Sequence, residues 1–258
     1  AQCDVSKLDA VSGLFERTKP NAVVHLAAIT GIARCGEKPS ESFLVNVVGT
    51  FNVAWVSAMY GSRLMFASSK EVYGEGTGAE TDESAELRPN NLYGFTKLLG
   101  ESLIRWLGAS TSLRYVILRF TNLYGPGGDQ YAVAAFIKKA IRGEEISVFG
   151  GDQVLNLIDV RDAARAIKIC LTKNQLDGEV FNIGSKEAVK VSDLVSRILQ
   201  LTGSRSRIAT ASKRPGDTLF FEPDLSKARR QLGFEPSLDL DHGLRDCIGH
   251  YRAQMKQE

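Results

Sequence analysis

Apolar positions along the first half of the chain follow two alternating patterns. Short continuous apolar runs, typical of strands buried on both faces of a parallel sheet, occupy residues 21–27, 63–67 and 115–120. Longer stretches in which apolar residues recur at helical spacing occupy residues 11–19, 40–60 and 93–107. This alternation predicts an α/β fold, in which helices connect the strands of a doubly wound, Rossmann-like parallel sheet.

The pattern changes after residue 120. Loops rich in Gly and Pro, with the sequences YGPGGD, FGGDQ and KRPGD, separate shorter helices. Two later segments, residues 157–171 and 179–183, are expected to return to the sheet. We therefore predict a first domain of residues 1–120 plus about 157–183, and a smaller C-terminal domain of residues 121–156 and 184–258.

The composition narrows the class of protein. With 43% hydrophobic and 24% charged residues among 258, the chain has the make-up of a globular domain, which excludes a disordered or collagen-like protein. No run reaches the roughly 18 uncharged apolar residues that a spanning helix requires, so we expect no membrane association. The net charge of +2 comes from scattered residues, and nothing indicates a nucleic-acid partner.

The cysteines and histidines indicate neither a disulfide framework nor a metal site. Cys3, Cys35, Cys170 and Cys247 lie far apart without a C-x-x-C pair, and the first residues lack the pattern of a signal peptide. The three histidines have no metal-ligand spacing. We therefore expect a cytoplasmic protein that holds no metal.

Tyr93 and Lys97 are the first candidates for chemistry. They lie four residues apart at the start of a predicted helix, so both side chains project from the same face. An unperturbed tyrosine has a pKa of about 10 and is a poor base at neutral pH, but a neighbouring cation favours tyrosinate. Ser69 follows the strand at residues 63–67, and ligands bind at the carboxyl ends of such strands. Ser69 is therefore positioned to hydrogen-bond a substrate hydroxyl.

Eight motifs extend this picture over nearly the whole chain. They are VVHLAA (23–28), VNVVGTFNV (45–53), FASSKEVYG (66–74), NLYGFTK (91–97), LRFTNLYGPGG (118–128), VFNIGS (180–185), RPGD (214–217) and LGFEP (232–236). In content and order they resemble the motifs of the extended short-chain dehydrogenase/reductases, in the nucleotide-sugar epimerase and dehydratase family. This resemblance implies an NAD-dependent enzyme whose first domain binds NAD and whose second binds a nucleotide sugar.

The resemblance also implies roles for individual residues. Tyr93 is the catalytic base, and Lys97 lowers its pKa toward 7 together with a positively charged nicotinamide, whose ribose Lys97 holds. Ser69 steadies the reacting sugar hydroxyl. The residues expected to contact NAD are Asp4, Val5, Leu26, Ala27, Ala28, Asn46, Tyr93 and Lys97. Those expected to contact the nucleotide sugar are Ser69, Asn122, Arg214 and Asp217.

Two departures from the family pattern qualify these expectations. Many members carry an Arg-Asp pair after the G-D-x-Q turn, with the arginine on the diphosphate, whereas Leu155 and Asn156 stand here. The family also begins with a G-x-x-G-x-x-G turn and an acidic residue after the second strand, and this chain starts beyond both. The sheet is therefore expected to be N-terminally incomplete, and the chain to bind NAD weakly, because that turn holds the pyrophosphate.

The triplet Ser69-Lys70-Glu71 bears on the reaction. The 4,6-dehydratases of the family carry Thr-Asp-Glu there, and the aspartic acid protonates the leaving hydroxyl. Lys70 replaces that acid, so epimerisation through transient oxidation at C4, which requires only Ser, Tyr and Lys, is the first expectation. A dehydratase or decarboxylase is the alternative, because Glu71 is retained. A sugar-nucleotide-binding relic or fragment without firm cofactor binding is another.

An assembly is also implied by the resemblance. In the family, the two helices that correspond to residues 40–60 and 93–107 pair across a two-fold axis as a four-helix bundle. The apolar residues Phe43, Val47, Leu99 and Leu103 on these helices are available for such packing. We therefore expect a homodimer.

Overall fold

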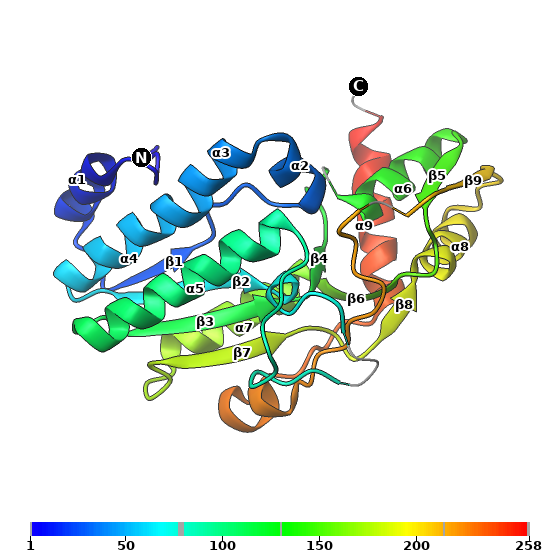
Figure 1. Cartoon of the computed structure of the whole chain (residues 1–258). Coiled ribbons are helices and arrows are strands. Elements are labelled where there is room, and N and C mark those ends of the chain that lie inside the picture. Colours follow the sequence, from blue (N-terminus) through cyan, green and yellow to red (C-terminus); the bar gives the residue numbers. More distant parts are fainter. Residues whose placement is uncertain (1, 77–79, 130, 214, 257–258) are drawn as a thin grey trace.

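A four-stranded parallel sheet forms the centre of the larger part of the molecule (Figure 1). The computed structural model describes residues 2–76, 80–129, 131–213 and 215–256. The sheet has the order β1-β2-β3-β7. Its strands are β1 (Ala22–His25), β2 (Arg63–Ser69), β3 (Tyr115–Phe120) and β7 (Glu179–Ile183), and each neighbouring pair is parallel. The predicted doubly wound α/β fold is confirmed.

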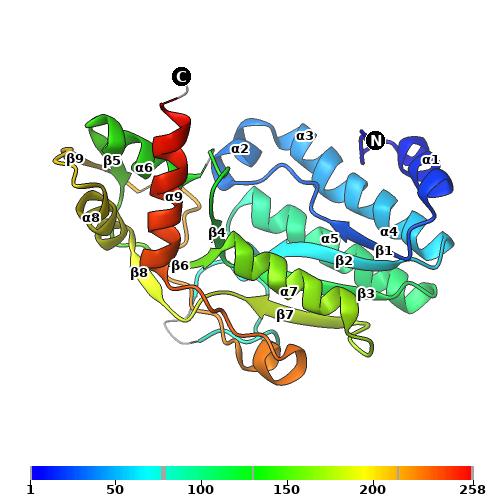
Figure 2. The same cartoon turned by 180° about the vertical axis from the view of Figure 1, so that it is seen from behind.

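Helices cover both faces of this sheet (Figures 1 and 2). One face is covered by α1 (Leu8–Thr18), α4 (Gly49–Met59) and α5 (Leu92–Ser110). The other is covered by α7 (Val160–Thr172) and the short helix η3 (Ala228–Leu232). Leu64 and Met65, neighbours on β2, pack into opposite cores, which explains why the strands are continuously apolar.

The long apolar helix predicted at residues 40–60 is present and contains a π-helical turn. It consists of α3 (Pro39–Phe43), a π-helical turn η1 (Leu44–Val48) and α4, and a short helix α2 (Ile32–Glu37) precedes it. Together Pro39–Met59 are long and apolar enough to cross a membrane, but 56% of the apolar window is buried inside the protein. Burial against the sheet and α5 accounts for its apolar character.

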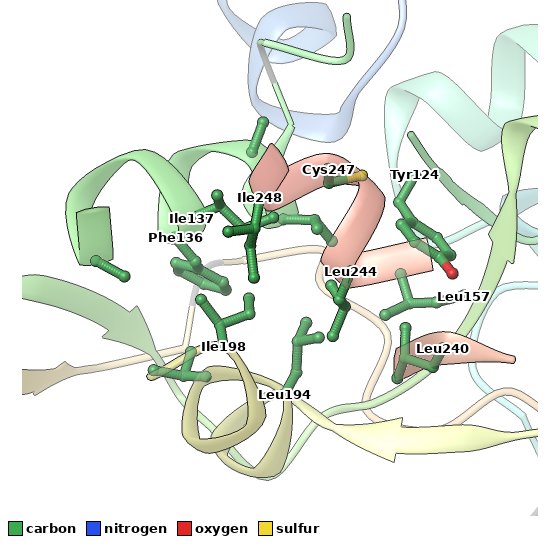
Figure 3. Packing of buried hydrophobic residues seen from close by; sticks show 14 of the residues in the cluster. Tyr124, Phe136, Ile137, Leu157, Leu194, Ile198, Leu240, Leu244, Cys247 and Ile248 are labelled. Atoms are coloured by element: carbon green, nitrogen blue, oxygen red, sulfur yellow. The ribbon is translucent and has the colours of Figure 1, made fainter. Parts of the chain in front are cut away.

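A smaller region lies beyond the carboxyl ends of the main strands. It contains the sheets β4-β6-β8 and β5-β9. Their strands are β4 (Asn122–Tyr124), β5 (Ile146–Phe149), β6 (Val154–Asp159), β8 (Ala188–Lys190) and β9 (Ile208–Ala211). Three helices, α6 (Ala132–Arg142), α8 (Val191–Thr202) and α9 (Leu240–Gln254), enclose a separate apolar core with β4, β5, β6 and β8. Figure 3 shows Ile137, Leu194 and Leu244 meeting there.

Of the two segments expected to return to the main sheet, the strand at 179–183 does so as β7. Residues 157–159 do not, because β6 pairs with β4 and β8 in the smaller region. The helix that follows β6, α7, packs on the main sheet and contacts β2. The chain therefore passes from one region to the other at the junction of β6 and α7.

Candidate active site

Ser69 lies at the carboxyl end of β2, where the strand turns into a short 3₁₀ helix, η2 (Lys70–Val72). Its Oγ accepts a hydrogen bond from the backbone N–H of Glu71 at 3.2 Å and so caps this turn. The hydroxyl is buried among the ends of β2 and β3. Its position at the edge of a parallel sheet agrees with the position predicted for it.

Tyr93 is brought to Ser69 by close contact between α5 and η2. Asn91 caps α5, accepting a hydrogen bond from the N–H of Gly94 at 2.9 Å. A Cβ on Gly94 would lie 2.2 Å from the carbonyl oxygen of Glu71, so only glycine permits this approach. The Tyr93 phenol and the Ser69 hydroxyl are hydrogen-bonded, and this contact favours the ionised phenol.

Lys97 completes the cluster from the next turn of α5. Its Nζ donates a hydrogen bond to the carbonyl oxygen of Ala67 at 2.7 Å and lies 5.9 Å from the centre of the Tyr93 ring. Burial lowers the pKa of Lys97 to about 8, against the opposing effects of Cys35 and Glu101. The ammonium is nevertheless mostly protonated at neutral pH.

The protein alone does not lower the pKa of Tyr93. Burial raises the pKa of the phenol above its ordinary value, and the nearby Tyr131 and Glu71 raise it further, while the Ser69 hydrogen bond opposes them. The lowering expected from the spacing of Tyr93 and Lys97 is therefore outweighed by desolvation, which that spacing does not reveal. Further positive charge is needed at this site before the phenol becomes a base at neutral pH.

A buried ion pair lies beside the cluster. The Nζ of Lys70 is 2.7 Å from Oε1 of Glu71, and both side chains are buried. Oε2 of Glu71 accepts a hydrogen bond from Asn91 at 2.8 Å. Both carboxylate oxygens of Glu71 therefore have partners within the protein.

A cavity of about 600 Å³ opens next to this pair, between the main sheet and the smaller region. It is lined by Ile32, Lys70, Glu71, Asn122, Tyr131, Ala132, Ala135, Phe136, Lys139, Ser147, Phe149, Gln153, Leu155, Val191, Asp217 and Thr218. Its volume and mixed lining are those of a small-molecule site. The structure therefore brings Asn122 and Asp217, both predicted to contact substrate, to one cavity beside the Tyr93 cluster.

Asn122 and Arg214 are two of the residues predicted to contact the substrate. The buried Oδ1 of Asn122 has no hydrogen-bond partner within the described residues, so this amide is available to a ligand. Arg214 lies outside the described residues.

Tyr131 joins the two regions above the cavity. Its hydroxyl is 2.7 Å from Oγ1 of Thr30, which lies in the loop after β1. The same tyrosine lines a second cavity of about 190 Å³ under the loop at residues 125–128. Sequence reasoning missed Tyr131, since no motif distinguishes it from a tyrosine at the start of a surface helix.

Leu26, Ala27 and Ala28 follow β1 at the same edge of the sheet. Leu26 is 57% exposed, and Ala27 is also exposed. An apolar side chain exposed at the carboxyl end of a parallel strand is a common contact for a bound ligand.

Asn46 is buried, and its amide is fully used within the protein. It accepts a hydrogen bond from the N–H of Ile29 at 2.7 Å and donates to the carbonyl oxygen of Ile29 at 2.9 Å and to Oγ1 of Thr96 at 3.0 Å. Asn46 therefore ties the loop after β1 to α5 and sets the separation of Leu26 from the Tyr93 cluster.

Asp4 and Val5 lie in the turn before α1. The carboxylate of Asp4 is exposed and accepts hydrogen bonds from the N–H and Oγ of Ser6 at 3.0 and 2.7 Å, which lower its pKa. The carbonyl oxygen of Val5 accepts from Asn52 at 3.0 Å, and the Val5 side chain packs on Gly49 of α4. This turn is thereby fixed against the N-terminal half of α4.

Leu155 and Asn156 occupy the positions at which the Arg-Asp pair was expected from the resemblance. Leu155 lines the large cavity with an apolar side chain. Asn156 is buried and donates to the carbonyl oxygen of Ser185 at 2.9 Å, while accepting from the Ser185 N–H at 2.8 Å. Neither residue brings a positive charge to the cavity.

Beneath the cluster lies a buried polar network that sequence reasoning missed. Glu101 of α5 accepts hydrogen bonds from Arg119 of β3 at 3.0 and 2.7 Å and from Ser68 at 2.5 Å. Arg119 also donates to the Tyr73 hydroxyl at 2.8 Å, which donates to Asn182 at 2.7 Å. The signal was present: an arginine inside the apolar run YVILRF requires a buried partner.

The chain is similar to known proteins over most of its length. A family model described as the NAD dependent epimerase/dehydratase family matches residues 1–184. The UDP-N-acetyl-α-D-glucosaminuronate decarboxylase of Bacillus cytotoxicus is 31% identical over 249 residues, covering 90% of this chain and 77% of that protein.

Two solved structures are similar over almost the whole chain. The UDP-glucose 4-epimerase of Thermotoga maritima with UDP-glucose superposes with a TM-score of 0.93 at 30% identity, covering 98% of this chain and 84% of that one. The UDP-glucose 4-epimerase of Thermus thermophilus in complex with NAD gives 0.89 at 26% identity, covering 96% and 83%.

Proposed function

Because the chain belongs to the NAD dependent epimerase/dehydratase family, we propose that it epimerises a nucleotide sugar at C4 through transient oxidation. The observation that carries this proposal is the hydrogen bond between Tyr93 and Ser69 beside the buried ammonium of Lys97. These three groups lie next to a cavity large enough for a small-molecule substrate. Relatives that are similar over nearly the whole chain act on UDP-glucose or bind it.

In this mechanism Tyr93 takes the proton from the C4 hydroxyl of the sugar and later returns it. Ser69 hydrogen-bonds the same hydroxyl and holds it toward the phenol. Lys97 contributes a positive charge beside the phenol, which favours the phenolate. The same base serves both the oxidation and the reduction, because the sugar rotates within the site between the two steps.

The residues around Lys97 fit a nicotinamide cofactor. Its ammonium has three donors and makes one hydrogen bond within the described residues, to Ala67, so two donors are available for ribose hydroxyls. The exposed Leu26 and Ala27 offer an apolar surface for the ring. When bound, NAD supplies a positively charged ring that accepts a hydride from C4 and gives it back.

Other residues would contact the cofactor away from the nicotinamide or would position the residues that contact it. Ala28 lines the same strand end. Asp4 and Val5 would meet the adenine side, with Asp4 already held by Ser6. Asn46 would act as a positioning residue, because its amide hydrogen bonds are all made to Ile29 and Thr96.

The nucleotide sugar would occupy the large cavity. Asn122 would contact the diphosphate by donating from the N–H groups of its amide, and Asp217 with Arg214 would hold ribose and phosphate. We assign residues 1–120 with about 157–183 to cofactor binding, and residues 121–156 and 184–258 to substrate binding. Within the first set, residues 157–159 belong to β6, which pairs with β4 in the smaller region.

The Lys70–Glu71 ion pair favours epimerisation over elimination. A 4,6-dehydratase needs a carboxylic acid to protonate the leaving hydroxyl, and Lys70 carries no such group. Both carboxylate oxygens of Glu71 are engaged, by Lys70 at 2.7 Å and by Asn91 at 2.8 Å. A decarboxylase is the second candidate, because this buried carboxylate lines the cavity and a relative 31% identical carries out a decarboxylation.

Proton NMR of the products distinguishes these reactions. The protein with NAD is incubated separately with UDP-glucose, UDP-glucuronate and dTDP-glucose. We expect one of them to give its C4 epimer with no loss of water or carbon dioxide. A pentose product from UDP-glucuronate would instead support the decarboxylase, and a 4-keto-6-deoxy product from dTDP-glucose the dehydratase.

We further propose a cytoplasmic homodimer. The four cysteines are free, as expected in a reducing compartment. Exposed apolar side chains gather on two adjacent helical segments, at Phe43, Leu44, Trp55, Phe95 and Trp106. Light scattering should give a dimer at micromolar concentration, and Trp106→Glu should shift it toward monomer; a monomeric wild type would contradict the proposal.

A further inference from the structure

The large cavity contains a lysine without a counter-ion. Two lysines line it, and Lys70 is neutralised by Glu71 at 2.7 Å. Lys139, by contrast, makes no side-chain hydrogen bond or ion pair with any residue that the structure describes. A cation that lines a binding cavity unpaired is available to an anionic ligand.

Lys139 belongs to the face of α6 that forms one wall of the cavity. The lining residues of this helix are spaced i, i+3, i+4 and i+7, at Ala132, Ala135, Phe136 and Lys139. Lys139 is therefore about 10 Å along the helix from Ala132. Because helical side chains lean toward the N-terminus of their helix, the Lys139 side chain leans toward the end of α6 that follows Tyr131, another residue of the cavity lining.

We infer that Lys139 binds the diphosphate of the nucleotide sugar and supplies the positive charge that Leu155 does not. This inference rests on the proposed function. A sugar whose C4 hydroxyl reaches Tyr93 carries its diphosphate one sugar ring farther into the cavity, toward Lys139 in the last turn of α6. The cavity continues to Ser147 and Phe149 of β5, which leaves room for the nucleoside beyond the diphosphate.

Calorimetric titration of the full chain with UDP and with dTDP tests the inference. The variants are Lys139→Met, which keeps the length of the side chain, and Lys139→Arg, which keeps its charge. Lys138→Met is the matched control, because the Nζ of Lys138 is 2.7 Å from Asp129 and the residue does not line the large cavity. Thermal unfolding verifies that each variant is folded.

We expect Lys139→Met to weaken binding of the nucleoside diphosphate about 10- to 100-fold, as for loss of one hydrogen bond to a charged group. Lys139→Arg should stay within about threefold of wild type, and Lys138→Met should bind as wild type. Equal affinity of wild type and Lys139→Met, or equal losses in the Met and Arg variants, would overturn the inference while the proposed function stands. A wild type that bound neither nucleotide would overturn both.

Discussion

The carboxylate of Glu101 on α5 lies 2.7 Å from the guanidinium of Arg119 on β3, and each side chain is 1% exposed. The pair joins the helix that carries Tyr93 and Lys97 to the centre of the sheet. Arg119 extends the connection to Tyr73, whose pKa burial raises to about 12. The site is therefore held to the sheet by charge as well as by apolar packing.

Removal of one partner of this pair should be strongly destabilising. Glu101→Leu leaves the Arg119 charge buried, and we expect the free energy of unfolding to fall by about 3–5 kcal/mol in urea titrations. The double variant Glu101→Leu with Arg119→Met should lose clearly less than the sum of the two single variants. Additive losses would show that the two side chains act independently.

Tyr93→Phe should abolish turnover while the fold is preserved. The phenylalanine keeps the ring but removes the group that exchanges a proton, and such groups contribute about 10² to 10⁴ in rate. Thermal unfolding and binding of UDP should stay close to wild type. Wild-type turnover in this variant would show that another group moves the proton.

Gly94→Ala should separate α5 from η2. The added Cβ would lie 2.2 Å from the backbone oxygen of Glu71. A backbone atom cannot move aside as the end of a flexible side chain can. We expect a loss of stability of about 1–3 kcal/mol and a fall in kcat, because Tyr93 follows the displaced helix. Gly249→Ala on α9 is the control, since a Cβ there meets nothing within 4 Å and should stabilise the helix by about 0.5–1 kcal/mol. Equal effects of the two substitutions would contradict the proposed contact.

His25 should make stability fall as the pH is lowered. Burial, followed by the charge of Lys97, lowers the pKa of His25 from 6.5 to about 3, so the unfolded chain takes up a proton below about pH 6.5 while the folded chain does not. Between these values the folded state loses up to about 1.4 kcal/mol per pH unit from this group.

His25→Leu should therefore flatten the acid side of the stability curve measured by urea titration at several pH values. His250→Gln, a change of an exposed histidine, serves as the control and should keep the wild-type slope. An unchanged slope in His25→Leu would show that carboxylates alone cause the acid dependence.

The regular elements of the main sheet were predictable from apolar runs. Both ends of the strand at 115–120 were predicted correctly, because burial on both faces leaves every position except Arg119 apolar. The strand at 21–27 was predicted too long, since Leu26 and Ala27 continue the apolar run but lie outside the sheet. The short strands of the smaller region, such as β4 and β8, are three residues long, which is too few for a period to appear.

The residues of the site were easier to predict than their electrostatics. The spacing of Tyr93 and Lys97 on one helix follows from helical geometry alone. The raised pKa of Tyr93 and the pairing of Lys70 with Glu71 depend on burial by segments distant in the sequence. No pattern along the chain reports how much water those segments exclude.

The π-helical turn at Leu44–Val48 changes the direction in which side chains before it point relative to those after it, while the helix Pro39–Met59 stays continuous. A turn of this kind accommodates one residue more than a regular α-helix. Deletion of a single residue there would restore α-helical spacing and rotate Pro39–Phe43 by about 100° about the axis relative to α4. Phe43 would then point in another direction relative to α4, or Asn46 would lose its hydrogen bonds to Ile29. This segment is therefore expected to tolerate substitutions of similar size far better than a change in length.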